Sequence, residues 1–201
     1  MRIIEQKDYI RLIEPKDCSS LRQVLRRYEI VLGKNFKIRD AIIYHNVEIG
    51  DNFETGHNVV IRENNHIGDN VCIWSNTVID YECSIGNNVK IHCNCYIAQR
   101  SVIKDRVFIA PGVVFSNDYH PGCSKYRTCM KGPIIEEDVK IGCNVTILPR
   151  VVIHRNSLIA AGSVVTKDVD ANSVVLGNPA RFYKSIFDLT CKTGITDKPY
   201  K

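Results

Sequence analysis

Isoleucine recurs every sixth residue through the middle of the chain, and this spacing limits the fold more than any other feature. Ten of the twelve positions in the register from Ile49 to Phe115 are isoleucine, Thr55 and Phe115 being the exceptions. The same register resumes at Ile135 and runs to Val165. Neither a helix nor a half-buried alternating strand has a period of six. Repeats of six residues are typical of a β-helix, in which each repeat is one short strand and one turn.

The repeat at residues 47–52 shows why six residues suffice for a strand and a corner. Val47 and Ile49 are two apart, so both point to the same side of an extended strand. Gly50 and Asn52 then tolerate the positive φ angles that a tight corner requires. Asparagine fills this last position in repeat after repeat: Asn52, Asn58, Asn64, Asn70, Asn76, Asn88 and Asn94. We therefore expect an all-β protein, a parallel β-helix with stacked apolar columns.

The rest of the chain divides around this repeat region. We expect residues 1–30 to form a small N-terminal α/β cap, with one strand and one helix. Residues 31–180 form the β-helix with a loop insertion at 119–132, and residues 181–201 form a short tail. A length of 201 residues is compatible with one main domain and small appendages.

Composition points to a protein of the cytoplasm that acts on small anionic molecules. No stretch approaches the roughly eighteen apolar residues of a membrane span, and the charged N-terminus is unlike a secretory signal. Nine cysteines, an odd number without a CxxC motif, argue against a full disulfide framework. The net charge of +5 is too diffuse to indicate nucleic acid as a partner.

The interruption of the repeat is the second informative feature. Residues 119–132 read YHPGCSKYRTCMKG and leave the six-residue register. Insertions in repeat proteins extrude as loops, often on the binding face. Long loops in compact domains also tend to be functional. We therefore expect this loop to contribute to a site.

The C-terminal part of the repeat region resembles a known family. The stretch AAGSVVTKDV at 160–169, followed by LGNPAR at 176–181, is similar to the C-terminal signature of hexapeptide-repeat acyltransferases. With the repeats, the resemblance covers roughly residues 30–181. It implies a left-handed β-helix with three repeats to a coil. It also implies a homotrimer that binds an acyl-CoA between neighbouring β-helices, with active sites between subunits.

The resemblance implies where the acyl-CoA co-substrate lies, and it implies no metal. Small residues at 160–162 would let the pantetheine arm approach the backbone, and basic groups would meet the CoA phosphates. The predicted cofactor-binding residues are Arg150, Ala160, Ala161, Gly162, Lys167, Asn178, Pro179 and Arg181.

Three further segments narrow the resemblance to one branch of the family. They are APGVVFSND at 110–118, KYR at 125–127 and GPIIEEDVKIGCNVTI at 132–147. They resemble N-acyltransferases that modify UDP- or dTDP-linked amino deoxysugars for surface glycans or lipopolysaccharide. The predicted substrate-binding residues are Ser84, Asn117, Asp118, Tyr126 and Arg127. The acyl chain, the nucleotide and the amine position, C-3 or C-4, stay open.

Two versions of the mechanism follow from the resemblance. In one, His120 is a general base, because the segment 119–121 resembles the Thr-His-Pro of sugar O-acetyltransferases and imidazole has a suitable pKa. In the other, no protein base is needed, and Asn94 positions an amine that is already a good nucleophile. His92 lies in the same repeat as Asn94 and is an alternative polar partner. Both versions stay open at this point.

Other classes of protein give different expectations. O-acetyl transfer to a simple sugar or serine would use His120 as the base. A non-catalytic scaffold subunit would need neither the loop nor the C-terminal signature. A zinc enzyme of the γ-carbonic-anhydrase kind would group His66, His92 and His120. Their spacings of 26 and 28 residues are not multiples of an eighteen-residue coil, which argues against that grouping.

Overall fold

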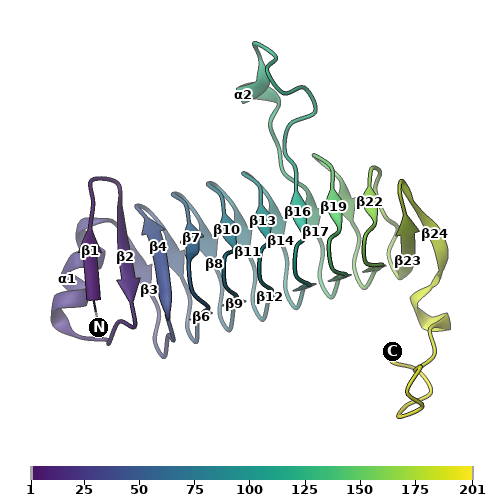
Figure 1. The fold of residues 1–201 in the computed structure, drawn as a ribbon, viewed down its shortest axis with the longest axis horizontal. Helices are drawn as coiled ribbons and strands as arrows, with labels where there is room; N and C mark the ends of the chain where they lie inside the picture. The colour runs from purple at the N-terminus through teal and green to yellow at the C-terminus, as the bar shows by residue number, and fades with distance from the viewer. Residues whose placement is uncertain (1, 201) are drawn as a thin grey trace.

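The chain winds into a parallel β-helix whose three sides are three sheets (Figure 1). The structure is a computed structural model, and it describes residues 2–200. Between β2 and β23, successive strands along the chain belong to different sheets, so each full coil contributes one strand to each side. The all-β solenoid of stacked hexapeptide coils agrees with the expected fold class and is consistent with its left-handed form.

We name the sides sheets A, B and C. Sheet A contains, in spatial order, β1 (Arg2–Glu5), β2 (Tyr9–Ile13), β4 (Asp40–Tyr44), β7 (Val59–Ile61), β10 (Val78–Ile79), β13 (Tyr96–Ile97), β16 (Val114–Phe115), β19 (Thr146–Ile147) and β22 (Val164–Val165). Sheet B contains β3 (Val31–Leu32), β5 (Glu48–Ile49), β8 (His66–Ile67), β11 (Ser84–Ile85), β14 (Val102–Ile103), β17 (Ile134–Ile135) and β20 (Val152–Ile153). Sheet C contains β6 (Glu54–Thr55), β9 (Cys72–Ile73), β12 (Lys90–Ile91), β15 (Phe108–Ile109), β18 (Lys140–Ile141), β21 (Leu158–Ile159), β23 (Ser173–Gly177) and β24 (Ala180–Ser185).

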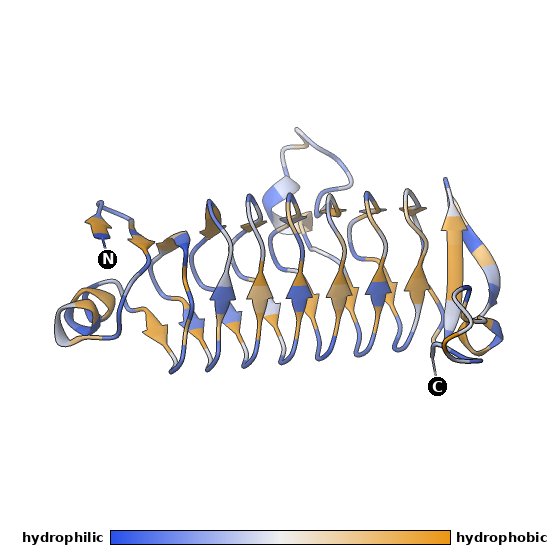
Figure 2. Cartoon of the chain, turned by 60° about the horizontal axis from the view of Figure 1, so that its bottom comes forward, coloured by the Kyte–Doolittle hydropathy of each residue, from blue (hydrophilic) through white to orange (hydrophobic). Residues whose placement is uncertain are grey.

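The isoleucines stack in columns because paired strands are one coil apart in sequence. Ile85 pairs with Ile67 on one side and Ile103 on the other, each eighteen residues away. These side chains are almost fully buried. Burying one such side chain is worth about 1.5–3 kcal/mol, so the columns form the main core. Figure 2 shows orange strands recurring along the prism, beside strands that are blue because their outward residue is polar, and the corners between them are largely blue.

The corners are built by residues with left-handed backbone. Asn94, for example, has a φ of 60°, a conformation that asparagine tolerates better than most residues. Corner asparagines also join successive coils through their side chains: Asn46 donates to Asn64 at 2.7 Å and Asn52 donates to Asn70 at 2.9 Å. The corners therefore carry both the turn and part of the vertical hydrogen bonding.

The N-terminal segment forms a hairpin and a helix. Sequence patterning predicts one strand before residue 14, whereas the structure has two, because the chain turns back at Gln6 and β1 pairs antiparallel with β2. Strand β2 then pairs antiparallel with β4 and so extends sheet A. Helix α1 (Ser19–Arg27) buries Leu21, Val24 and Leu25 at the N-terminal end of the prism (Figure 1).

The first and last coils depart from the eighteen-residue spacing. Leu32 pairs with Ile49, seventeen residues on, and Val174 pairs with Leu158, sixteen residues back. A strict period of six cannot detect these coils. The stacked structure therefore extends beyond the isoleucine register at both ends.

Two segments leave the prism. The loop between β16 and β17 projects from it and holds a short helix, α2 (Tyr126–Cys129) (Figure 1). After the β23–β24 hairpin, a 3₁₀ helix, η1 (Ile186–Asp188), leads into the tail, where the Tyr200 ring lies 5.2 Å from the Lys140 ammonium. Within residues 2–200, no helix is long and apolar enough to cross a membrane.

The cysteine thiols have contrasting environments, which predicts the order of their alkylation. A hydrogen bond from Thr193 and nearby backbone amides lower the pKa of Cys191 to about 6, while burial raises the pKa of Cys83 to about 12. Because the thiolate is the reactive form, we expect iodoacetamide at pH 7 to modify Cys191 before Cys83. The rate at Cys191 should fall as the pH drops below 6. Mass spectrometry of timed samples measures both, and equal rates at the two cysteines would contradict the expectation.

Candidate functional site

The prism has three edges, and the predicted site residues fall on different ones. The C–A edge, between sheets C and A, includes the corners at 92–95, 110–113, 142–145 and 160–163. The A–B edge includes the corners at 80–83, 98–101 and 148–151, together with the loop. The remaining edge is the B–C edge.

The structure separates the three predicted catalytic residues. His92 and Asn94 lie together on the C–A edge. His120 lies in the loop on the A–B edge, where its side chain is exposed and its amide donates to the Asp118 carboxylate at 2.9 Å. Within one chain, therefore, the loop histidine and the corner asparagine belong to different edges of the prism.

Asn94, like Asn144, has a glycine stacked above it, whereas other corner asparagines such as Asn58 donate to an asparagine in the next coil. The next corner position on the C–A edge is Gly112, which has no side chain to bond the Asn94 amide. A Cβ at Gly112 would lie 2.2 Å from Oδ1 of Asn144, so the Asn144 side chain covers the glycine from the coil beyond. Among the hydrogen bonds of residues 2–200, none involves the Asn94 side chain. Its amide is therefore exposed and available to a ligand.

His92 is fixed from several directions. Its ring packs against Phe108, with 5.0 Å between ring centroids, and its amide donates to the Ile109 carbonyl at 2.9 Å. Its own carbonyl accepts from the buried Thr77 hydroxyl at 2.8 Å. Sequence reasoning did not single out Phe108 or Thr77. Two features of the sequence could have pointed to them: Phe108 is an aromatic residue in an outward-facing strand position, and Thr77 is a hydroxyl residue in an inward-facing position.

A pocket beside the C–A edge begins at Phe108. Its volume is about 520 Å³. Its lining is mostly apolar and consists of Phe108, Lys140, Ile141, Gly142, Leu158, Ile159, Ala160, Ala161 and Tyr200. It includes two of the predicted CoA-binding residues, Ala160 and Ala161. Gly162 follows them at the corner with a φ of 72°, and a Cβ there would meet nothing within 4 Å. Within the chain, the glycine thus serves the turn, and no close contact requires it.

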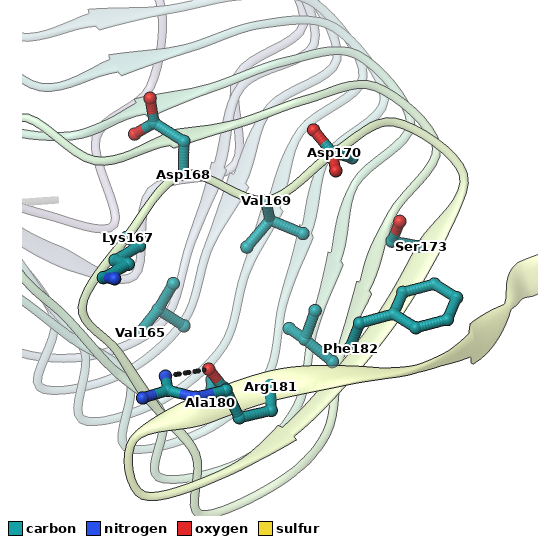
Figure 3. Close-up of a pocket in the computed structure, with 10 residues that line it drawn as sticks. Val165, Lys167, Asp168, Val169, Asp170, Ser173, Ala180, Arg181 and Phe182 are labelled. Carbon is teal, nitrogen blue, oxygen red and sulfur yellow. Dashed lines mark hydrogen bonds between the residues drawn. The ribbon is translucent and has the colours of Figure 1, made fainter.

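Two predicted phosphate-binding residues lie together at the C-terminal end of the prism. Lys167 and Arg181 line a pocket of about 250 Å³, which also includes Asp168 and Asp170 (Figure 3). The Arg181 guanidinium donates to the Ala180 carbonyl at 2.9 Å.

The remaining predicted CoA-binding residues lie elsewhere. Asn178 and Pro179 are exposed in the turn between β23 and β24, joined by a cis peptide bond. Arg150 lies on the A–B edge, where its Nη2 donates to the Cys129 carbonyl at 2.8 Å. In this chain Arg150 therefore holds the loop, a role that the sequence did not indicate.

Of the predicted substrate-binding residues, Asn117 and Asp118 lie at the start of the loop, and Tyr126 and Arg127 lie in its helix α2. Asn117 donates to the Gln99 side chain, and the guanidinium of Arg127 contacts the hydroxyl of Tyr126 at 3.1 Å. Ser84 lies apart, facing outward from sheet B beside His66. His66, His92 and His120 therefore occupy sheet B, the C–A edge and the loop, and form no common site within one chain.

Removing the Arg150 side chain should loosen the loop without unfolding the coils. The Arg150→Ala variant loses the bond to Cys129, and one such bond contributes about 0.5–1.5 kcal/mol. We expect faster tryptic cleavage after Lys125 and Arg127, with nearly unchanged thermal unfolding. Arg106→Ala is the control, because Arg106 pairs with Asp138 on the B–C edge. Equal cleavage of both variants and the wild type would show that Arg150 does not hold the loop.

Comparisons with known proteins agree with the repeat architecture. The family described as "Bacterial transferase hexapeptide (six repeats)" matches residues 82–117 and 132–167, on either side of the loop. No curated protein sequence matches the chain.

Solved structures that resemble the chain include soybean serine acetyltransferase complexed with serine, at 28% identity and a TM-score of 0.45, covering 51% of this chain and 40% of that one. Serine acetyltransferase from Brucella abortus strain S19 has 28% identity and a TM-score of 0.45, and the match covers 52% of this chain and 40% of that one. A serine acetyltransferase in complex with CoA has 25% identity and a TM-score of 0.44, and the match covers 51% of this chain and 40% of that one. The chain spans less than half the length of these structures. In its matched repeats and its stacked coils, the repeat region resembles the hexapeptide-repeat transferase family.

Proposed function

We propose that the protein is an acyl-CoA-dependent N-acyltransferase. Its acceptor is the amine of a dTDP- or UDP-linked amino deoxysugar, and its donor carries an acetyl or larger acyl group. The product serves surface glycan or lipopolysaccharide biosynthesis. The match of the repeats to a transferase family supports group transfer, and the segments that resemble amino-sugar N-acyltransferases support this acceptor.

The observation that carries the proposal is the arrangement on the C–A edge. The exposed Asn94 amide has only a glycine stacked above it, and His92 lies two residues away. Phe108 contacts His92 and also lines the apolar pocket that reaches Ala160. A thioester lying in that pocket would place its reacting end toward a polar corner. This continuity of an apolar channel and a polar end suits an acyl-CoA and an amine acceptor.

The chemistry asks little of the protein beyond positioning. The amine nitrogen bonds to the acyl carbon, the carbon–sulfur bond breaks, and CoA leaves as a thiolate. The nitrogen loses a proton and the thiolate gains one. We assign to Asn94 the donation of a hydrogen bond where negative charge develops or the amine is held. We assign to His92 the role of first proton acceptor, and His120 is the alternative.

The separation of the two edges supports an active site shared between copies of the chain. His120 and the cluster of Tyr126 and Arg127 lie on the A–B edge, whereas Asn94 lies on the C–A edge. In a homotrimer the A–B edge of one copy can face the C–A edge of the next. The loop would then carry nucleotide-binding side chains to the neighbour's Asn94.

An acceptor panel tests the proposal. Purified protein is mixed with acetyl-CoA or longer acyl-CoAs and with dTDP- and UDP-linked 3-amino and 4-amino deoxysugars, and free thiol release is followed. We expect release only with an amine acceptor, and an amide-bonded product by mass spectrometry. The N-acetylated form of the same sugar nucleotide is the matched control, because it lacks the nucleophile.

Two other results would redirect the assignment. Thiol release with a simple sugar or serine, but with no amino sugar, would favour O-acyl transfer with His120 as base. No release with any acceptor, and no binding to immobilised CoA, would favour a scaffold subunit. Comparing His92→Ala with His120→Ala across pH decides between the two proton acceptors.

A further inference from the structure

We infer that the Thr77 hydroxyl is a positioning group for the corner that presents His92 and Asn94. The inference rests on the proposed function, and it names a residue that touches neither substrate. Thr77 precedes β10 on the C–A edge, one coil before the His92–Asn94 corner. It occupies an inward-facing position that Val59 and Val113 fill in other coils, and it is 0% exposed.

The hydroxyl of Thr77 joins both ends of the corner. It donates to the His92 carbonyl at 2.8 Å and accepts from the Cys95 amide at 3.2 Å. Asn94 lies between these two residues, at a φ of 60°. A single buried group therefore holds the peptide on each side of the turn that displays the exposed amide.

Apolar residues at the same position cannot make this connection. Val59 and Val113 have no side-chain donor, and the corners above them lack such a clamp. A valine at 77 would keep the volume of threonine and leave two buried polar groups without their partner. Unpartnered buried groups are costly, so the turn would shift to reach other partners. Small displacements of positioning groups lower rates strongly.

The outer contacts of the corner do not replace this clamp. The backbone N–H of Asn94 donates to the Ser75 carbonyl at 3.0 Å, and this bond orients only that one peptide group. The His92 ring is held by Phe108, which leaves the carbonyl side of the residue to Thr77. Loss of the hydroxyl should therefore move the corner while the His92 ring stays near Phe108.

The test compares Thr77→Val, Thr77→Ser and Thr55→Val. Thr55 is an equally buried threonine whose hydroxyl accepts from the Arg39 amide at 3.2 Å, in a coil that contains none of the site residues. We expect Thr77→Val to lower kcat about ten- to a hundredfold, with KM for both substrates nearly unchanged. We expect Thr77→Ser to restore kcat and Thr55→Val to keep it.

A second readout does not depend on activity. Hydrogen exchange of the peptide containing residues 92–97 should accelerate in Thr77→Val and return to the wild-type rate in Thr77→Ser. An unchanged kcat in Thr77→Val, or an equal loss in Thr55→Val, would overturn the inference. Wild-type protein that transfers no acyl group would overturn the proposed function. In that case, unchanged exchange at 92–97 in Thr77→Val would overturn the clamp as well.

Discussion

Replacing Asn94 with glycine should lower kcat/KM for acyl transfer about a hundredfold, the size of effect seen when one hydrogen-bond donor to a developing charge is removed. Glycine is the informative replacement because it accepts the left-handed backbone of this corner without strain. The chain itself has glycine at the equivalent positions Gly112 and Gly162. The loss should therefore come from the missing amide and not from a distorted turn. Steady-state rates at several concentrations of each substrate measure it.

Asn58→Gly provides the matched control. Asn58 lies on the same edge two coils earlier, has a φ of 55°, and donates to the Asn76 side chain at 3.3 Å. Removing the Asn58 side chain should break this hydrogen bond between coils and leave the rate of acyl transfer almost unchanged. If Asn94→Gly is as active as Asn58→Gly, Asn94 is an ordinary corner asparagine, and the site must be placed elsewhere.

Phe115→Ala should lower the free energy of unfolding by about 3–5 kcal/mol, the range for removing a buried aromatic side chain. Phe115 is 0% exposed and occupies the position that isoleucine holds in the neighbouring coils, pairing with Ile147 in sheet A. It is also the last core residue before the loop leaves the prism. Coils contact only their neighbours in a solenoid, so a cavity here would weaken the connection between the two halves.

Phe115→Ile is the companion variant, because it restores the residue of the column while filling most of the volume. Its loss of stability should be clearly smaller than that of the alanine variant. Urea unfolding followed by circular dichroism measures both, at one fixed protein concentration because association shifts apparent stability. A loss below about 1 kcal/mol for Phe115→Ala would mean that the coils repack around the space.

Some residues behave as their sequence pattern predicts, and others do not. The period of six places Ile67, Ile85 and Ile103 in one column, because a repeated local conformation returns every third block to the same side. The pattern does not show that Arg150 has a partner, since that partner, the Cys129 carbonyl, belongs to helix α2 in the loop, outside the repeats. It also does not detect the first coil at Leu32, whose spacing to the next is seventeen residues.

By itself, the sequence determined the stacked coils, the buried columns and the corners, because these depend on residues within one repeat and on a constant spacing. The constant spacing also places Gly112, eighteen residues on, above Asn94. Tertiary structure alone decided what lies beyond that glycine. Stacking brings Asn144 over Gly112 across the loop insertion, thirty-two residues along the chain. The environment of a corner depends on the coils above and below it, and an interrupted repeat does not specify those neighbours locally.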